Sequence, residues 1–148
     1  MGINLALAGR AYPPSPAYEV SRGKIAEFAT AIGSDDPAHT DPAVARALGH
    51  PDVVAPPTFA VVIAQRAEAQ LFADPDAGVD YARLVHGEER FTHHRPVVAG
   101  DLLTATLHVD TAREVGGHGM ITTRVELADA AGAPVSTVVS TVVIRGDE

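Results

Sequence analysis

The chain has 148 residues, a formal net charge of −8 and no cysteine. This length predicts one domain spanning residues 1–148, with a hydrophobic core of its own. Phosphate binding needs clustered Lys and Arg, and the 11 basic residues are scattered, so we expect neither nucleic acid nor an anionic membrane as a partner. The lack of cysteine excludes disulfides and thiolate chemistry.

The first ten residues do not have the pattern of a targeting segment. Their apolar run is too short for a signal peptide, and no basic region precedes it. No stretch of the chain reaches the length of a transmembrane helix. We therefore expect a cytoplasmic protein.

Short elements separated by prolines are predicted before residue 57. Residues 12–16 are extended and residues 18–20 fit a short strand. Ser21 caps a helix that ends at Gly33, where a left-handed conformation carries little strain. The apolar positions of this helix recur at spacings of three and four, and they are Ile25, Phe28, Ala29 and Ile32.

A second small helix follows the loop over residues 34–40. Asp41 suits the cap position and Pro42 the first turn, where a missing N–H costs nothing. The helix is expected from about Ala43 to Leu48, before Gly49. A proline-rich connection over residues 51–56 then leads to the next element.

A strongly apolar helix is predicted from Pro57 to Phe72. Pro57 suits its first turn, and Asp74 with Pro75 ends it. Residues 59–64 have no polar face, which is typical of a helix packed into a sheet. The second half is expected to reach water through its polar side chains, which are Gln65, Arg66, Glu68 and Gln70.

From residue 81 onward the pattern changes to strands separated by turns. Strands are predicted over about 83–95, 101–111, 120–127 and 135–144. Turn signals near residues 98–101, 116–119 and 130–132 predict that consecutive strands are mostly antiparallel neighbours. The expected fold class is α+β, with an antiparallel sheet of about five strands wrapped around one central α-helix and short helices inserted before it.

Four segments carry a family resemblance that covers nearly the whole chain. They are residues 31–39, 54–59, 86–88 and 94–101, whose sequences are AIGSDDPAH, VAPPTF, HGE and HRPVVAGD. With the order of elements, they resemble the MaoC-like hydratase/dehydratase family, and within it the FAS1-like dehydratase N-terminal branch of stand-alone actinobacterial subunits. The resemblance implies the hot-dog fold. It also implies acyl-CoA or acyl carrier protein (ACP) thioesters as substrates, interconverted between (3R)-3-hydroxyacyl and trans-2-enoyl forms.

The family motif Gly-Asp-x-Asn-Pro-x-His, whose Asp and His are the catalytic pair, aligns with residues 33–39. Pro37 and His39 match it, but Ser34 stands in place of the Asp and Asp36 in place of the Asn. Either Asp35 takes over the carboxylate role, or the chain lacks half of the catalytic pair. The candidate catalytic residues are therefore His39, Asp35, Asp36 and Ser34. The alternative is ordinary turn and cap chemistry in this loop.

The start of the central helix is the expected site for the thioester. Backbone N–H groups there lack partners and favour negative charge, and Thr58 and Phe59 carry the earliest N–H groups after two prolines. Val62 and Ile63, together with Phe59, are expected to line a tunnel for the acyl chain.

No metal or cofactor is expected. His86, Glu88, His93 and His94 have no recurring ligand spacing, and on a strand His93 and His94 point to opposite faces. Arg95 is interpreted as a strand-face charge, with a phosphate contact as the alternative.

Two classes of function remain open at this point. One is a (3R)-3-hydroxyacyl-thioester dehydratase or enoyl-thioester hydratase of fatty-acid metabolism, acting as a homodimer or as a heterodimer with a MaoC-like catalytic subunit. The other is a non-catalytic subunit that binds acyl chains or stabilises such a partner, which Ser34 favours. A hot-dog thioesterase is the weaker third option, because the only acid of the central helix, Glu68, lies late in it.

Overall fold

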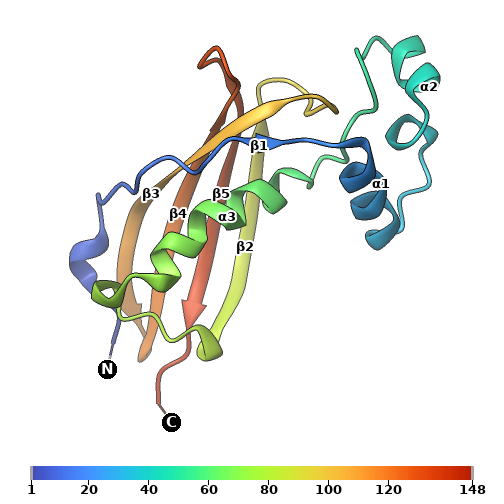
Figure 1. The fold of residues 1–148 in the computed structure, drawn as a ribbon. Coiled ribbons are helices and arrows are strands. Elements are labelled where there is room, and N and C mark those ends of the chain that lie inside the picture. Colours follow the sequence, from blue (N-terminus) through green and yellow to red (C-terminus); the bar gives the residue numbers. More distant parts are fainter. Residues whose placement is uncertain (1, 148) are drawn as a thin grey trace.

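The computed structural model describes residues 2–147 and contains one antiparallel five-stranded sheet that curls around a central helix (Figure 1). The strands are β1 (Tyr18–Glu19), β2 (Leu84–His93), β3 (Leu102–Val115), β4 (His118–Ala128) and β5 (Pro134–Ile144). The helices are α1 (Arg22–Ala31), α2 (Pro42–Ala47) and α3 (Ala60–Ala73). This arrangement confirms the predicted α+β, hot-dog architecture.

The long strands bury one face each. Along β3, β4 and β5 buried and partly exposed residues alternate, because successive side chains of a strand point to opposite sides of the sheet. The β3–β4 turn consists of Gly116 and Gly117 alone, both with positive φ (59° and 80°). That conformation suits a two-residue hairpin, so β3 and β4 extend further towards the turn than predicted.

The strand order is β1-β3-β4-β5-β2, so sequence neighbours are not always sheet neighbours. The β3–β4 and β4–β5 pairs are hairpins, as predicted. β2, however, pairs with β5, placing Phe91 opposite Val138, and lies at the edge of the sheet away from β3. The segment between β2 and β3 is therefore a crossing connection instead of a hairpin.

The central helix α3 begins at Ala60, three residues later than predicted. Residues 57–59 form a turn instead, in which the Phe59 N–H donates to the Pro56 carbonyl at 2.9 Å. The Phe59 side chain is fully buried and meets Phe28 of α1 edge to face, with 5.5 Å between ring centroids. Burying such a ring contributes roughly 1.5–3 kcal/mol, which fixes α1 against the start of α3. α3 then packs on the inner face of β3, β4 and β5.

Glu68 does not reach water, which corrects the prediction for the second half of α3. Its side chain is buried among strands, where Thr123 donates to its Oε1 at 3.3 Å. The Ser140 hydroxyl lies 2.8 Å from the same oxygen and 2.8 Å from both carboxylate oxygens of Glu89 on β2. One hydroxyl hydrogen satisfies only one of these acceptors. Burial, with the neighbouring Glu89 charge, raises the pKa of Glu68, and its Oε2 is buried without a partner among the described residues.

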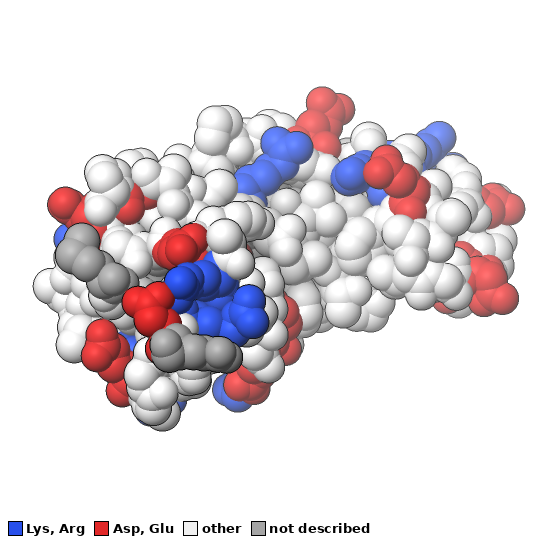
Figure 2. Space-filling model, turned by 90° about the horizontal axis from the view of Figure 1, so that it is seen from below, with Lys and Arg blue, Asp and Glu red and all other residues white. Residues whose placement is uncertain are grey.

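Charges of both signs are mixed over the end of the molecule seen in Figure 2. Among the ion pairs, Arg83 lies within ion-pairing distance of Asp80 and Asp147. Over residues 2–147 no helix is long and apolar enough to cross a membrane.

Asp52 ties the two small helices to the connection that precedes α3. Arg22 of α1 donates to both Asp52 carboxylate oxygens at 2.9 Å, the Val53 N–H donates at 2.7 Å, and Arg46 of α2 lies 3.9 Å away. The Arg22 hydrogen bonds, followed by the Val53 N–H, lower the pKa of Asp52 from 3.8 to about 2.

We expect Asp52→Asn to remove part of the acid sensitivity of folding. Because the folded pKa of Asp52 is depressed, its contribution is present above about pH 4 and is lost as the pH falls through about 2. Urea unfolding midpoints measured across this range should therefore decline less steeply in the variant. Asp35→Asn is the matched control, since Asp35 makes no side-chain hydrogen bond within residues 2–147. Equal acid slopes in wild type and Asp52→Asn would contradict the expectation.

Candidate active site

The loop that carries the motif starts from a well-defined helix end. Gly33, with φ 72°, follows the last turn of α1, and its N–H donates to the Thr30 carbonyl at 3.1 Å. The Ser34 N–H donates to the Ala29 carbonyl at 2.9 Å. This pair of bonds is a Schellman motif, which explains why glycine occupies position 33. It fixes the backbone of half-buried Ser34 at the point where the loop leaves the helix.

The two aspartates of the loop have different environments. Asp36 Oδ1 accepts the Ala38 N–H at 2.9 Å and so caps the 3-10 helix Pro37–His39. This is the structural role that turn chemistry predicts for such a residue. Asp35 is exposed, and its carboxylate makes no side-chain hydrogen bond in the described part of the chain. Of the two, Asp35 is the carboxylate that remains free.

His39 is buried, with 6% of its surface exposed, and its ring is oriented by the backbone. Its Nδ1 lies 2.7 Å from the carbonyl oxygen of Val54. A carbonyl oxygen only accepts, so Nδ1 carries the hydrogen and, in the neutral ring, Nε2 carries the lone pair. No residue from 2 to 147 forms a hydrogen bond with that Nε2. The arrangement suits a general base.

A pocket of about 380 Å³ opens at the start of α3, and His39 is not among the residues that line it. Val54, whose carbonyl orients His39, also forms part of the pocket wall. The other lining residues come from the connection before α3, the first residue of α3 and the end of β2 with its following loop: Ala55, Pro56, Pro57, Ala60, His93, His94, Arg95, Pro96 and Val97. The pocket is thus built from two segments about forty residues apart in the chain.

The predicted thioester donors require a correction. The Phe59 N–H is already bonded to the Pro56 carbonyl, and the Phe59 ring lies in the core, so Phe59 does not supply a free donor. The N–H groups of Thr58 and Ala60 have no acceptor among the described residues and lie at the positive end of a 14-residue helix. Ala60 was not predicted as a donor, because the helix was expected to start earlier, and the role of Thr58 as a thioester donor stays a prediction.

The predicted acyl-lining residues also differ from the pocket seen here. Ile63 is fully buried in the core and Val62 is half buried, and neither lines the pocket at the helix start. The apolar lining of this pocket comes from prolines and Ala60 instead. Their position follows from the turn over residues 57–59, which a helical pattern does not encode.

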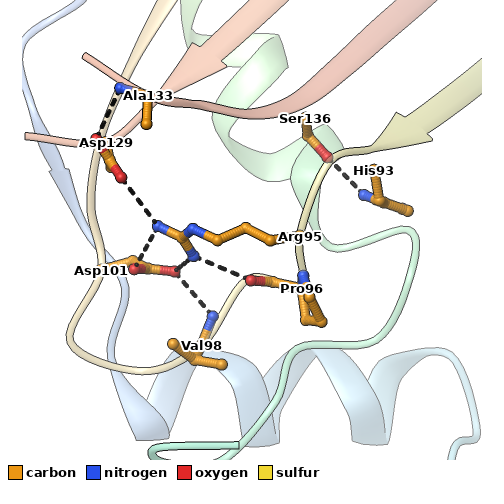
Figure 3. A network of polar contacts seen from close by, with 8 residues as sticks. All are labelled: His93, Arg95, Pro96, Val98, Asp101, Asp129, Ala133 and Ser136. Atoms are coloured by element: carbon orange, nitrogen blue, oxygen red, sulfur yellow. Dashed lines mark hydrogen bonds and ion pairs between the residues drawn. The ribbon is translucent and has the colours of Figure 1, made fainter. Parts of the chain in front are cut away.

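Figure 3 shows the polar contacts of two residues that line the pocket, His93 and Arg95. His93, at the end of β2, forms a short hydrogen bond through Nδ1 with the hydroxyl of buried Ser136 on β5. The Arg95 side chain extends away from His93 and donates to both carboxylate oxygens of Asp101, at 2.9 and 3.0 Å. Asp129 lies 3.7 Å from the same guanidinium. Arg95 is thus engaged by two carboxylates, which does not favour the alternative in which it binds a phosphate.

No group of three or more His, Asp or Glu side chains within residues 2–147 is arranged to hold a metal ion. His93 and His94 have different partners, because His94 Nε2 lies 3.4 Å from the Thr137 hydroxyl while His93 contacts Ser136. The ionisable side chains that line the pocket are therefore His93, His94 and Arg95.

Comparison with protein families gives a match over most of the chain. Residues 6–138 match the family described as "FAS1-like, dehydratase domain region". A UPF0336 protein, Lxx02810 of Leifsonia xyli subsp. xyli, is 51% identical over 146 residues, which cover 99% of this chain and 98% of that protein.

Two solved structures are similar over nearly all of this chain. A protein titled MaoC-like dehydratase superimposes with a TM-score of 0.88 and 36% identity over 95% of this chain. The match spans 43% of that longer protein, so less than half of it has a counterpart here. The HadBC (3R)-hydroxyacyl-ACP dehydratase complex from Mycobacterium tuberculosis gives a TM-score of 0.83 and 30% identity over 93% of this chain and 96% of the matched chain.

Proposed function

The chain belongs to the FAS1-like dehydratase branch of the MaoC-like hydratase/dehydratase family, and from this premise we propose that it is one subunit of a (3R)-3-hydroxyacyl-thioester dehydratase. The reverse reaction is hydration of a trans-2-enoyl thioester. The proposed substrates are acyl chains carried on coenzyme A or on acyl carrier protein in fatty-acid metabolism.

The observation that carries this proposal is the orientation of His39. Its Nδ1–H is held by the carbonyl of Val54, a residue that lines the pocket, and the Nε2 lone pair has no hydrogen-bond partner among residues 2–147. In the proposed dehydration, Nε2 takes the C2 proton while the thioester oxygen accepts hydrogen bonds from the N–H groups of Thr58 and Ala60. Charge that builds on that oxygen is stabilised by donors already in place. The C3 hydroxyl then leaves as water, once an acid protonates it.

The acid is the group that this chain does not supply at the usual position. Ser34 occupies the place of the family aspartate, and a serine hydroxyl is far too weak an acid to replace a carboxyl group. Asp36 is engaged as a cap, and Asp35 is the carboxylate of this loop that makes no side-chain hydrogen bond among residues 2–147. A second candidate function therefore has a specific observation in its favour: a non-catalytic subunit that binds the acyl thioester or stabilises a MaoC-like partner with an intact Asp and His.

The thioesterase alternative is less favoured. The one acid of α3, Glu68, is buried among β-strands with Ser140 and Thr123, and it does not line the pocket at the start of the helix. A carboxylate that activates water must contact the bound thioester.

The subunit role has support from a similar structure. HadBC is named as a complex of (3R)-hydroxyacyl-ACP dehydratase, so a protein of similar fold forms a complex.

We expect the purified chain alone to hydrate a short trans-2-enoyl-CoA very slowly and a mixture with its MaoC-like partner to do so rapidly. The reason is that the chain supplies a base and oxyanion donors but no carboxyl group at position 34. The measurement is loss of the enoyl thioester absorbance with either protein alone and with both together. A mixture no faster than the sum of the separate proteins would contradict the proposed subunit role, and release of free thiol would indicate a thioesterase.

A further inference from the structure

We infer that the ion pair between Arg95 and Asp101 positions the His39 imidazole, through two backbone segments that lie between them. Asp101 is thus a positioning residue for the histidine. The structural part of this inference stands by itself, whereas its consequence for catalysis rests on the proposed function.

The first step is the closure of the loop that follows β2. Arg95 donates to both oxygens of Asp101, and its Nη1 also donates to the Pro96 carbonyl at 3.0 Å (Figure 3). The Val98 N–H donates to Asp101 Oδ2 at 2.9 Å. One carboxylate therefore holds both a guanidinium and a backbone N–H. Charge-assisted, bidentate bonds of this kind are roughly twice as strong as neutral ones and fix the geometry as well. The Asp101 side chain is only 12% exposed, so water competes little for it.

The second step is the pairing of this loop with the segment before α3. The Ala55 N–H donates to the Val97 carbonyl at 2.8 Å, and the Ala99 N–H donates to the Val53 carbonyl at 3.0 Å. Val54 and Val98 form an antiparallel bridge between these bonds. The backbone over residues 97–99 thus fixes the position of Val54.

The third step is the hydrogen bonding of Val54 to the loop that carries the family motif, residues 34–40. The Val54 N–H donates to the Ala38 carbonyl at 3.1 Å, and the Val54 carbonyl accepts the His39 Nδ1–H at 2.7 Å. Both backbone groups of one residue therefore hold residues 38 and 39. A shift of residues 97–99 would move the carbonyl that selects the His39 tautomer.

Asp101→Asn tests this chain of contacts because it removes the charge with little change in size. The tautomer of His39 is read from its imidazole nitrogen signals by NMR without substrate. We expect a single Nδ1–H tautomer in wild type and a mixture of tautomers in Asp101→Asn. In the assembled enzyme, kcat should fall by up to about 10²-fold with little change in KM, because a misplacement of about 1 Å has an effect of that size.

Arg95→Lys is the second variant, since lysine keeps the charge but not the bidentate geometry, and it should shift the His39 signals in the same direction. It also decides the outcome if Asp101→Asn does not fold. Asp110→Asn is the matched control, because it removes an Asp–Arg pair with Arg124, at 3.4 Å, on β3 and β4. Unchanged His39 signals in folded Asp101→Asn and Arg95→Lys would overturn the inference. Altered signals with unchanged activity would instead confirm positioning and contradict the catalytic role of His39.

Discussion

Ser34→Asp will raise the hydratase activity of the isolated chain by about 10² to 10⁴-fold, the usual contribution of one positioned acid or base. The backbone from Gly33 to Pro37 has the length of the family motif, and His39 is already oriented with a free Nε2. A carboxyl group at position 34 would start from the fixed, half-buried end of α1. The rate of trans-2-enoyl-CoA hydration by the chain alone is the measurement.

Matched variants separate the explanations of the result. Ser34→Asn has the shape of the aspartate but no acid, and it should leave the activity at the wild-type level. His39→Ala combined with Ser34→Asp should abolish the gain, because the base is then absent. If wild type is already active, Asp35→Asn tests whether Asp35 supplies the carboxylate, and Ser34→Asp should then add little. If none of these variants changes the activity of the chain or of its complex, the loop is structural and catalysis belongs to the partner.

Glu68→Gln will remove most of the decline in stability that we expect for wild type as the pH rises above about 4.5. Burial raises the pKa of Glu68 above its ordinary value of 4.5, so the folded state retains a proton that the unfolded chain releases. The contribution of protonated Glu68 to the free energy of unfolding is therefore complete below about pH 4.5, and it is lost as the pH rises through the pKa of Glu68 in the folded state. Within this window the slope approaches about 1.4 kcal/mol per pH unit. Denaturant unfolding at several pH values measures it.

The hydrogen bonds explain why glutamine is a suitable replacement. Ser140 lies 2.8 Å from Glu68 and from both oxygens of Glu89, so a donor on residue 68 removes a conflict among acceptors. A glutamine amide donates at every pH, whereas the carboxyl group donates only while protonated. Glu88→Gln, on the exposed part of β2, is the control and should keep the wild-type slope. Parallel pH profiles for wild type and Glu68→Gln would show that Glu68 is ionised in the folded protein.

Local signals in the sequence predicted much of the fold. The cap at Ser21, the left-handed Gly33 and the Asp41–Pro42 start were identified because each acts within one turn of its own helix. The hot-dog arrangement came from the family resemblance together with the order of elements. The start of α3 was wrong by three residues, since two consecutive prolines are compatible with both a first helical turn and a preceding tight turn.

The candidate site was predicted only in part, because its walls come from distant segments. His39 was identified from its motif, but the Val54 carbonyl that orients it belongs to a segment that pairs with residues 97–99. Glu68 was predicted to reach water, because helical periodicity does not show which strand residues lie opposite each helix position. The contacts of Ser140 with both Glu68 and Glu89 arise only because β5 pairs with β2 and also packs against α3.

The position of β2 at the edge of the sheet bears on how much of the protein persists in the cell. β2 is ten residues long, and in the described part of the chain only β5 pairs with it, so one row of its backbone groups is open to another strand. Its bulge near Gly87 and its exposed charged side chains limit wrong pairing but do not cover the row. If a partner subunit covers this edge, we expect chains made in excess of that partner to be degraded first. The supply of partner, and not only synthesis of this chain, would then set its abundance.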